Sequence, residues 1–149
     1  MLTIVIISVG KKHDATMKDV IDKYQLRLSR YCKLEWRIIP SSDKSTESDR
    51  ILSSIQKSDE VVLLDETGEH LNNKLLTGFI EDASVRASVS RLVFIIGGSY
   101  GVDQILKNQI KHIYSLSGLI LPHQIVRLIL VEQIYRSYTI IKGLQYHHE

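Results

Sequence analysis

The chain has 149 residues, of which 44% are hydrophobic and 24% charged, with one cysteine and a net charge of +2. This length suits one compact domain with a hydrophobic core of its own. A lone cysteine excludes the intramolecular disulfide framework of small secreted proteins, which favours a reducing compartment such as the cytoplasm.

The first third of the chain predicts a strand, a helix and a second strand. The run at 2–9 is apolar and β-branched; no positive residue precedes it and no cleavage site follows, so we interpret it as a strand and not as a signal peptide. Apolar residues recur at helical spacing through 14–32, with Asp14 as the expected N-cap and Cys32 as a structural residue late in the helix. Alternation through 34–40 predicts a half-buried or edge strand.

The middle of the chain continues the alternation of helices and strands. The polar stretch "SSDKSTESD" predicts a loop, within which Thr46, with Asp49 three residues later, is expected to cap a short helix over 47–57. The apolar residues of 60–68 predict a third strand that runs into a turn. A helix is predicted over 72–88, although it contains Gly78.

The last third predicts two further strands and two helices. Residues 91–98 are continuously apolar, which is typical of a strand buried on both faces. A short helix is expected over 102–110, a fifth strand within 114–123, and a long helix from 124 to about 142. Strands separated by helices predict an α/β fold: a mostly parallel sheet of about five strands, covered by helices on both faces.

The long C-terminal helix is apolar around nearly its whole circumference. A surface helix shows only one apolar stripe, so this helix needs cover on two sides. We expect the sheet on one side and a second subunit on the other, the alternative being a helix central to its own monomer. Arg127, Glu132, Arg136 and Lys142 interrupt its apolar residues, so we expect no membrane partner.

Two glycines follow the fourth strand in "RLVFIIGGSYG", and a third comes three residues later. The spacing matches neither G-x-G-x-x-G nor a phosphate-binding Gly-Lys-Ser/Thr sequence, and the expected acidic residue is missing. An NAD-dependent oxidoreductase is therefore disfavoured. Glycines let the backbone approach a ligand closely, so a nucleoside without phosphates fits this loop, and a purely structural turn is the alternative.

Other polar residues give weaker indications. His13, His70 and His112 are isolated and expected to face solvent, and the adjacent His147 and His148 have no third ligand at a suitable spacing, so no metal site is predicted. Asp65 and Glu66 follow a strand, either as acids or as turn residues. Residues 11–33 carry seven Lys/Arg against three Asp, which indicates either a polyanion-binding segment or a solvated helix face.

The glycine loop and the C-terminal third together form a specific pattern. "FIIGGSYG" and "LSGLILPHQIVRLILVEQIYRSYTIIKGLQYHH", with the start "IVIISVGK" and the turn "LLDETG", closely resemble the ribosomal RNA large subunit methyltransferase H family of the SPOUT superfamily. The resemblance covers nearly the whole chain. Each piece alone is a weak signal, but their combination is highly specific.

The resemblance implies a single SPOUT methyltransferase domain over 1–149 with a C-terminal trefoil knot. It further implies a cytoplasmic homodimer, paired through the C-terminal helix, that uses S-adenosyl-L-methionine to methylate N3 of a pseudouridine in the 23S rRNA of assembled ribosomes. Two alternatives are a SPOUT methyltransferase for another RNA such as tRNA, and a ribosome-binding assembly factor without catalytic activity.

The resemblance also implies roles for individual residues. Arg127 and Arg136 would bind the substrate or stabilise charge, Tyr146 would close over the base, and His147 would accept its proton. His148 stands where relatives more often have a basic residue, which puts a phosphate contact there in doubt. The residues implied for the cofactor are Leu64, Gly97, Leu116, Ser117, Gly118, Leu119, Ile120 and Leu121, and His123 would shape the cofactor loop.

Overall fold

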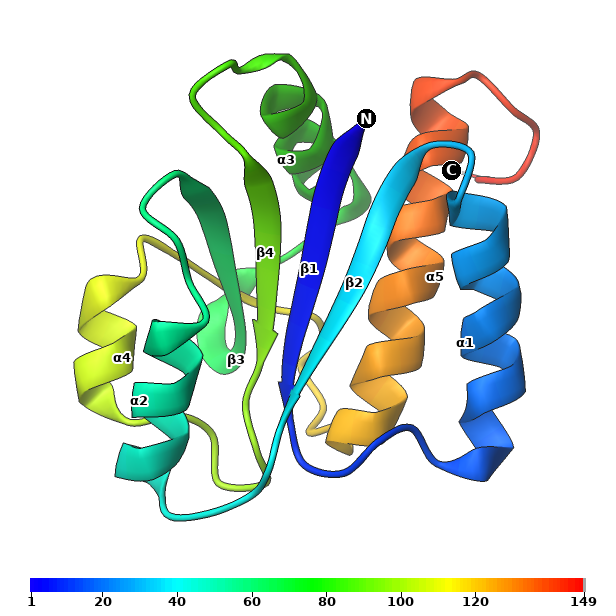
Figure 1. The fold of residues 1–149 in the computed structure, drawn as a ribbon. Helices are drawn as coiled ribbons and strands as arrows, with labels where there is room; N and C mark the ends of the chain where they lie inside the picture. The colour runs from blue at the N-terminus through cyan, green and yellow to red at the C-terminus, as the bar shows by residue number, and fades with distance from the viewer. Residues whose placement is uncertain (149) are drawn as a thin grey trace.

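The computed structural model describes residues 1–148 as a central sheet with helices on both sides (Figure 1). All neighbouring strands are parallel, in the order β2-β1-β4-β3-β5, which confirms the predicted α/β class. The strands are β1 (Leu2–Val9), β2 (Cys32–Ile39), β3 (Asp59–His70), β4 (Arg91–Ile96) and β5 (His112–Ser115). The helices are α1 (Ala15–Leu28), α2 (Lys44–Ser53), α3 (Asn73–Val85), α4 (Gln104–Gln109) and α5 (His123–Ile141).

The hydrophobic core has two layers, one on each face of the sheet. On one face, Ile4 and Ile6 of β1 and Phe94 of β4 pack under α1, α3 and α5. On the other, Ile7 of β1 and Ile95 of β4 pack under α2 and α4. The central strand β4 therefore buries both of its faces, as its continuous apolar sequence predicts.

The fifth strand differs from its prediction. It begins at His112 and ends at Ser115, so most of 114–123 forms a loop in which Leu119 and Ile120 are 76% and 85% exposed. Local hydrogen bonds explain the difference, because Ser115 Oγ donates to the Ser117 carbonyl at 2.7 Å and Leu119 N donates to Ser117 Oγ at 2.9 Å. Such side-chain bonds to nearby backbone compete with a sheet ladder.

Several predicted helix ends were also wrong. Asp43 and not Thr46 caps α2, because its carboxylate accepts the N–H of Thr46 at 2.9 Å. Asp14 is the N-cap residue of α1, as predicted, although its side chain makes no capping hydrogen bond. That helix ends at Leu28, so Cys32 begins β2, where burial raises the pKa of its thiol to about 11.

An irregularity in β3 shapes one end of the sheet. Leu64 and Glu69 of β3 both pair with Tyr114 of β5, so residues 65–68 bulge out of the ladder between them. Bulges of this kind redirect side chains and are frequent beside active sites. The segment predicted as a turn after the third strand is therefore an insertion within a longer strand.

Gly68 and Gly78 are expected to affect stability for different reasons, the first through close packing and the second through helix propensity. A Cβ at Gly68 would lie 2.6 Å from the backbone of Ile113, whereas one at Gly78 in α3 would meet nothing within 4 Å. We predict that Gly68→Ala lowers the free energy of unfolding by about 2 kcal/mol or more through overpacking. Gly78→Ala, the matched control, should raise it by about 0.5–1 kcal/mol. Urea unfolding measures both changes, and equal effects would contradict this packing at Gly68.

Helix α5 finds much of its cover within its own chain. It packs on the sheet and contacts both α1 and α3 (Figure 1). Half-buried apolar side chains such as Ile125 and Ile129 remain on it, so a partner subunit stays a prediction that the packing alone does not require. The trefoil knot also stays a prediction. Within residues 1–148 no helix is both long and apolar enough to span a bilayer.

Candidate functional site

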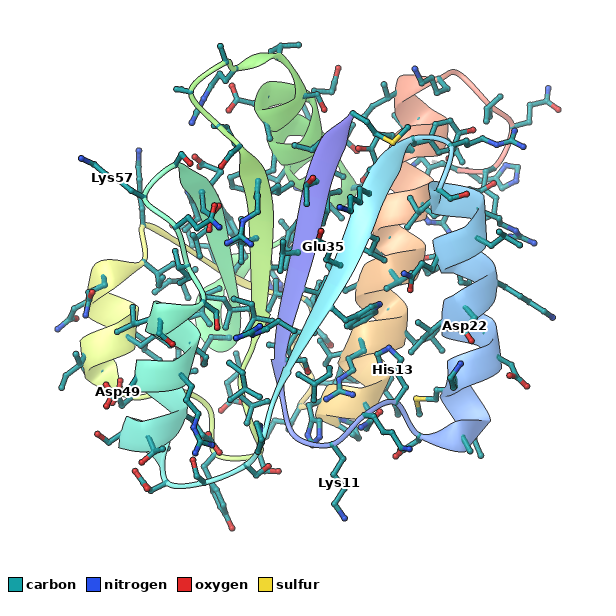
Figure 2. The ribbon with its side chains drawn as sticks, viewed as in Figure 1. Lys11, His13, Asp22, Glu35, Asp49 and Lys57 are labelled. Carbon is teal, nitrogen blue, oxygen red and sulfur yellow. The ribbon has the colours of Figure 1, made fainter. Side chains whose placement is uncertain are left out.

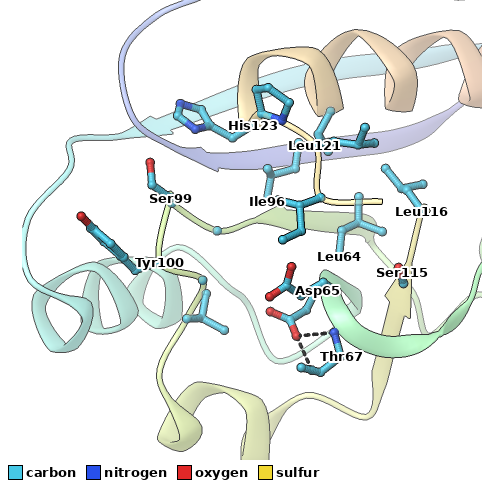
Figure 3. Close-up of a pocket in the computed structure, with 18 of the residues that line it drawn as sticks. Leu64, Asp65, Thr67, Ile96, Ser99, Tyr100, Ser115, Leu116, Leu121 and His123 are labelled. Atoms are coloured by element: carbon cyan, nitrogen blue, oxygen red, sulfur yellow. Dashed lines mark hydrogen bonds between the residues drawn. The ribbon is translucent and has the colours of Figure 1, made fainter. Parts of the chain in front are cut away.

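A cavity of about 680 Å³ lies between the bulge of β3 and the carboxyl end of β4, beside the loop that follows β5 (Figure 3). This volume falls within the usual range for small-molecule sites. Ligands of open parallel sheets bind beyond the carboxyl ends of the strands, so the cavity is where the topology places a ligand. Leu121, just before α5, and His123, at its first position, line the upper part of the wall (Figure 3).

The cavity gathers nearly all of the residues that the sequence assigned to a cofactor. Gly118 is the one exception, since it does not line the wall and a Cβ there would meet nothing within 4 Å. The predicted residues that do line the wall are Leu64, Gly97, Leu116, Ser117, Leu119, Ile120 and Leu121. Three segments far apart in the sequence, one in β3 and two in loops, therefore converge on one site.

The glycine loop supplies backbone to this wall. Gly101 N donates to the Gly98 carbonyl at 2.9 Å, which closes a tight turn, and Gly101 has φ +75°, a conformation that favours glycine. A Cβ at Gly97 would lie 3.0 Å from Val102 Cγ1. Tyr100 at the tip of the turn is 85% exposed. A side chain at Gly97 would push the turn out of place.

The bulge of β3 supplies the polar part of the wall. Asp65 accepts hydrogen bonds from the backbone N–H of Thr67, at 3.0 Å, and from its hydroxyl (Figure 3). Lys107 of α4 pairs with Asp65 at 3.3 Å. Burial alone would raise the pKa of Asp65, but the hydrogen bonds from Thr67 and the charge of Lys107 hold that pKa below its ordinary value.

Because hydrogen bonds from Thr67 help to lower the pKa of Asp65, replacing Thr67 should change the stability of the fold in a pH-dependent way. A carboxyl whose pKa is lower in the folded state stabilises the fold above its unfolded pKa, and that stability is lost as the pH falls through the folded pKa. Thr67→Val should raise the pKa of Asp65 and cost about 1 kcal/mol at neutral pH, the scale of one hydrogen bond. The cost should shrink in acid. NMR titration of the Asp65 carboxyl measures the shift, and an unchanged pKa would contradict it.

Arg127, predicted to contact substrate, is fully buried one helical turn after His123 of the cavity wall. Its Nε donates to Ser8 Oγ at 2.7 Å, Nη1 lies 3.3 Å from His13 Nδ1, and Nη2 has no hydrogen-bond partner among the described residues. Burial, followed by the charge of Arg127, lowers the pKa of both His13 and His123. His13 was predicted to face solvent. It is instead half-buried in the loop between β1 and α1, beside the first turns of α5 (Figure 2).

The other predicted catalytic residues form a separate cluster at the far end of α5. Arg136 Nη1 lies 3.4 Å from His147 Nδ1, and the Arg136 guanidinium lies 4.8 Å from the centre of the Tyr146 ring. The Tyr146 hydroxyl donates to Glu132 at 3.1 Å and lies 3.3 Å from the Tyr24 hydroxyl. Burial and these two neighbours raise the pKa of Tyr146, so its hydroxyl stays protonated.

The two clusters are well separated along α5. His123 in the cavity wall and Arg136 in the tail cluster are 13 residues apart in one helix, which corresponds to about 20 Å along its axis. Figure 1 shows the C-terminal tail at the opposite end of α5 from the loops of the cavity. Within one chain, the structure therefore brings the predicted cofactor residues together and the tail residues together, but does not bring the two sets to each other.

Sequence comparisons find relatives over the whole chain. A family described as "Predicted SPOUT methyltransferase" matches residues 2–147. The chain is 36% identical to the ribosomal RNA large subunit methyltransferase H of Christiangramia forsetii, covering 99% of both chains. The enzyme of that name from Clostridium botulinum is 37% identical, covering 98% of this chain and 99% of its own. A putative RNA methyltransferase of Arabidopsis thaliana is 33% identical over 99% of this chain and 80% of its own.

A solved structure has a similar fold. The tRNA (m1G37) methyltransferase from Aquifex aeolicus aligns over 91% of this chain and 69% of its own, with a TM-score of 0.52. The two sequences are 19% identical in this alignment, so the likeness concerns the fold alone.

Proposed function

The chain belongs to the SPOUT methyltransferase family, and from that premise we propose that it is an S-adenosylmethionine-dependent enzyme that methylates N3 of a pseudouridine in 23S rRNA. The observation that carries the proposal is the cavity, where the glycine turn, the β3 bulge and the loop before α5 converge. The proposed substrate is the RNA of the large ribosomal subunit, because the relatives of this chain are named for that RNA. We propose a single-domain cytoplasmic protein.

The residues of the cavity fit the methyl donor. Leu64, Ile96 and Leu116 offer apolar surface for a flat purine, and the backbone of the glycine turn lies open beside them. Asp65 adds a carboxylate that can accept hydrogen bonds from hydroxyl or ammonium groups. When bound, the cofactor supplies an electrophilic methyl group on a sulfonium, and the transfer requires no metal.

The tail cluster fits the chemistry required at the base. N3 of a uracil-type ring is a weak acid, so the chain must remove its proton and stabilise the charge left on the ring oxygens. We assign proton removal to His147, because an imidazole accepts protons near neutral pH and Tyr146 stays protonated. Arg136, at 3.4 Å from His147, would stabilise the developing charge. Arg127 would help to stabilise this charge from its buried position near the cavity wall.

The separation of the two clusters supports a homodimer. Reacting groups must approach within about 3–3.5 Å, which a tail held at the far end of α5 does not allow in its own chain. Two copies paired antiparallel through α5 by a two-fold axis would bring each tail to the other copy's cavity. Ile125, Ile129, Glu132 and Arg136 recur at helical spacing on α5 and are only half-buried, so this stripe is the proposed contact.

Calorimetry with S-adenosylmethionine separates the proposed enzyme from an assembly factor that only binds RNA. We expect saturable binding by the wild-type protein, and much weaker binding when Gly97→Val disturbs the turn. A folded protein that binds large-subunit RNA but not the cofactor would favour the assembly factor. Cofactor binding together with methylation of tRNA, and not of rRNA, would favour the second alternative.

A further inference from the structure

Glu132 is the centre of a hydrogen-bond network that joins α5 to the C-terminal tail. Its Oε1 accepts from Arg136 Nη2 at 2.6 Å and from the Tyr146 hydroxyl at 3.1 Å. Its Oε2 accepts from Gln133 Nε2 at 2.7 Å. The side chains of Glu132 and Arg136 are only 18% and 25% exposed, so solvent screens this pair less than an ordinary surface ion pair.

The network extends to both helices that flank α5. Through Gln133, whose Oε1 accepts from Asn73 Nδ2 at 2.6 Å, it reaches the start of α3. Through Tyr146, whose hydroxyl lies 3.3 Å from that of Tyr24, it reaches α1. Gln133 therefore holds Glu132 from the side of α3, and Glu132 holds Tyr146 on the side of α1. These bonds fix the position of the Glu132 carboxylate.

Two groups of the proposed site depend on this carboxylate. Arg136 has its Nη2 on Glu132 and its Nε without a hydrogen-bond partner among the described residues, so Glu132 determines how the guanidinium faces Tyr146 and His147. Among the described tail residues, only Tyr146 has a side chain that hydrogen-bonds to α1 and to the Glu132 carboxylate. A charge-assisted bond to each group favours a single arrangement of both.

We propose that Glu132 is a positioning residue that orients Arg136 and docks the tail through Tyr146, with Tyr24 as the second anchor. The inference rests on the proposed function, since it assigns Glu132 a role in presenting His147 to the base. The carboxylate itself touches no reacting atom in this role. Its negative charge lies beside Arg136, where it opposes binding of an RNA phosphate, so its benefit is to geometry and not to RNA affinity.

Glu132→Gln keeps the shape of the side chain and removes its charge. We expect kcat for RNA methylation to fall about tenfold, the scale of one lost charge-assisted bond. The KM for RNA should stay the same or fall, and cofactor affinity should not change. A merely structural defect would instead raise KM and weaken cofactor binding. The double variant with Tyr146→Phe should lose little more than Glu132→Gln alone, because Tyr146→Phe removes a bond that Glu132→Gln has already weakened.

Limited trypsin digestion reports tail docking without any assay of activity. Lys142 is exposed at the end of α5, and cleavage after it releases the tail, which intact-mass spectrometry detects. Cleavage should be several-fold faster in Glu132→Gln and faster in Tyr24→Phe than in the wild type, as expected when a docking bond is lost. Asp82→Asn, which removes an i,i+4 pair with Arg86 on α3, is the matched control and should change nothing.

The outcomes separate this inference from the proposed function. A wild-type protein that methylates no RNA refutes the proposed function, while the trypsin rates still decide whether Glu132 docks the tail. An active wild type whose Glu132→Gln variant keeps its kcat and its slow cleavage overturns the inference and leaves the function standing. Equal effects of Glu132→Gln and Asp82→Asn would also overturn it.

Discussion

Replacing His147 with alanine should lower kcat for RNA methylation by about a hundredfold or more, the scale of a lost general base. Affinity for S-adenosylmethionine should not change, because the cofactor is assigned to the residues that line the cavity and His147 is assigned to the base. Single-turnover methylation measures the first quantity and calorimetry the second. An equal loss of both would argue against a catalytic role for His147.

The neighbouring histidine offers a matched control for this substitution. His148 is exposed in the same tail. His148→Ala should therefore keep most of the activity under the same conditions. If both variants lost activity to the same extent, the defect would belong to the tail as a whole and not to the imidazole of His147.

A mixture of two inactive variants should regain activity. In Gly97→Val the cofactor turn is disturbed, and in His147→Ala the tail is defective, so neither homodimer has a complete site. If each site combines the cavity of one copy with the tail of the other, every heterodimer has one complete site. Random reassociation makes half of the dimers heterodimers, so about a quarter of wild-type activity should return.

This complementation depends on subunit exchange and on folded variants. Circular dichroism should show that Gly97→Val retains the fold, since the close contacts of a Cβ there are confined to Gly101 and Val102 at the end of the same turn. Each variant mixed with itself serves as the control. Mixtures that exchange subunits but remain inactive would place the cavity and the tail of the active site in the same chain and overturn the shared-site proposal.

The strand and helix order was predictable because each element carries a strong local signal. The apolar run of β4 and the alternation in β2 mark a central and an edge strand, and the sheet order agrees with both. The apolar loop before α5 misled the prediction of β5, since Leu119 and Ile120 are large apolar residues that nevertheless lie exposed in a loop. The strand propensity of a residue does not indicate whether its side chain will be buried or exposed in the folded protein.

The candidate site was predictable only in part. Motif resemblance placed the loops that line the cavity, but the pair of Asp65 and Lys107 joins a bulge to a helix 42 positions later, a spacing that no local pattern indicates. The burial of Arg127 depends on Ser8 and His13 at the other end of the chain. Contacts of this range arise from the packing of α5 beside β1 and α1.

Mass spectrometry of large-subunit rRNA from cells with and without this protein tests the proposed function most directly. We predict one pseudouridine that carries an additional methyl group only when the protein is present. Purified protein with S-adenosylmethionine should restore that methyl group on ribosomes from the deficient cells. Identical rRNA in the two strains, or a methyl group lost from tRNA instead, would contradict the proposal.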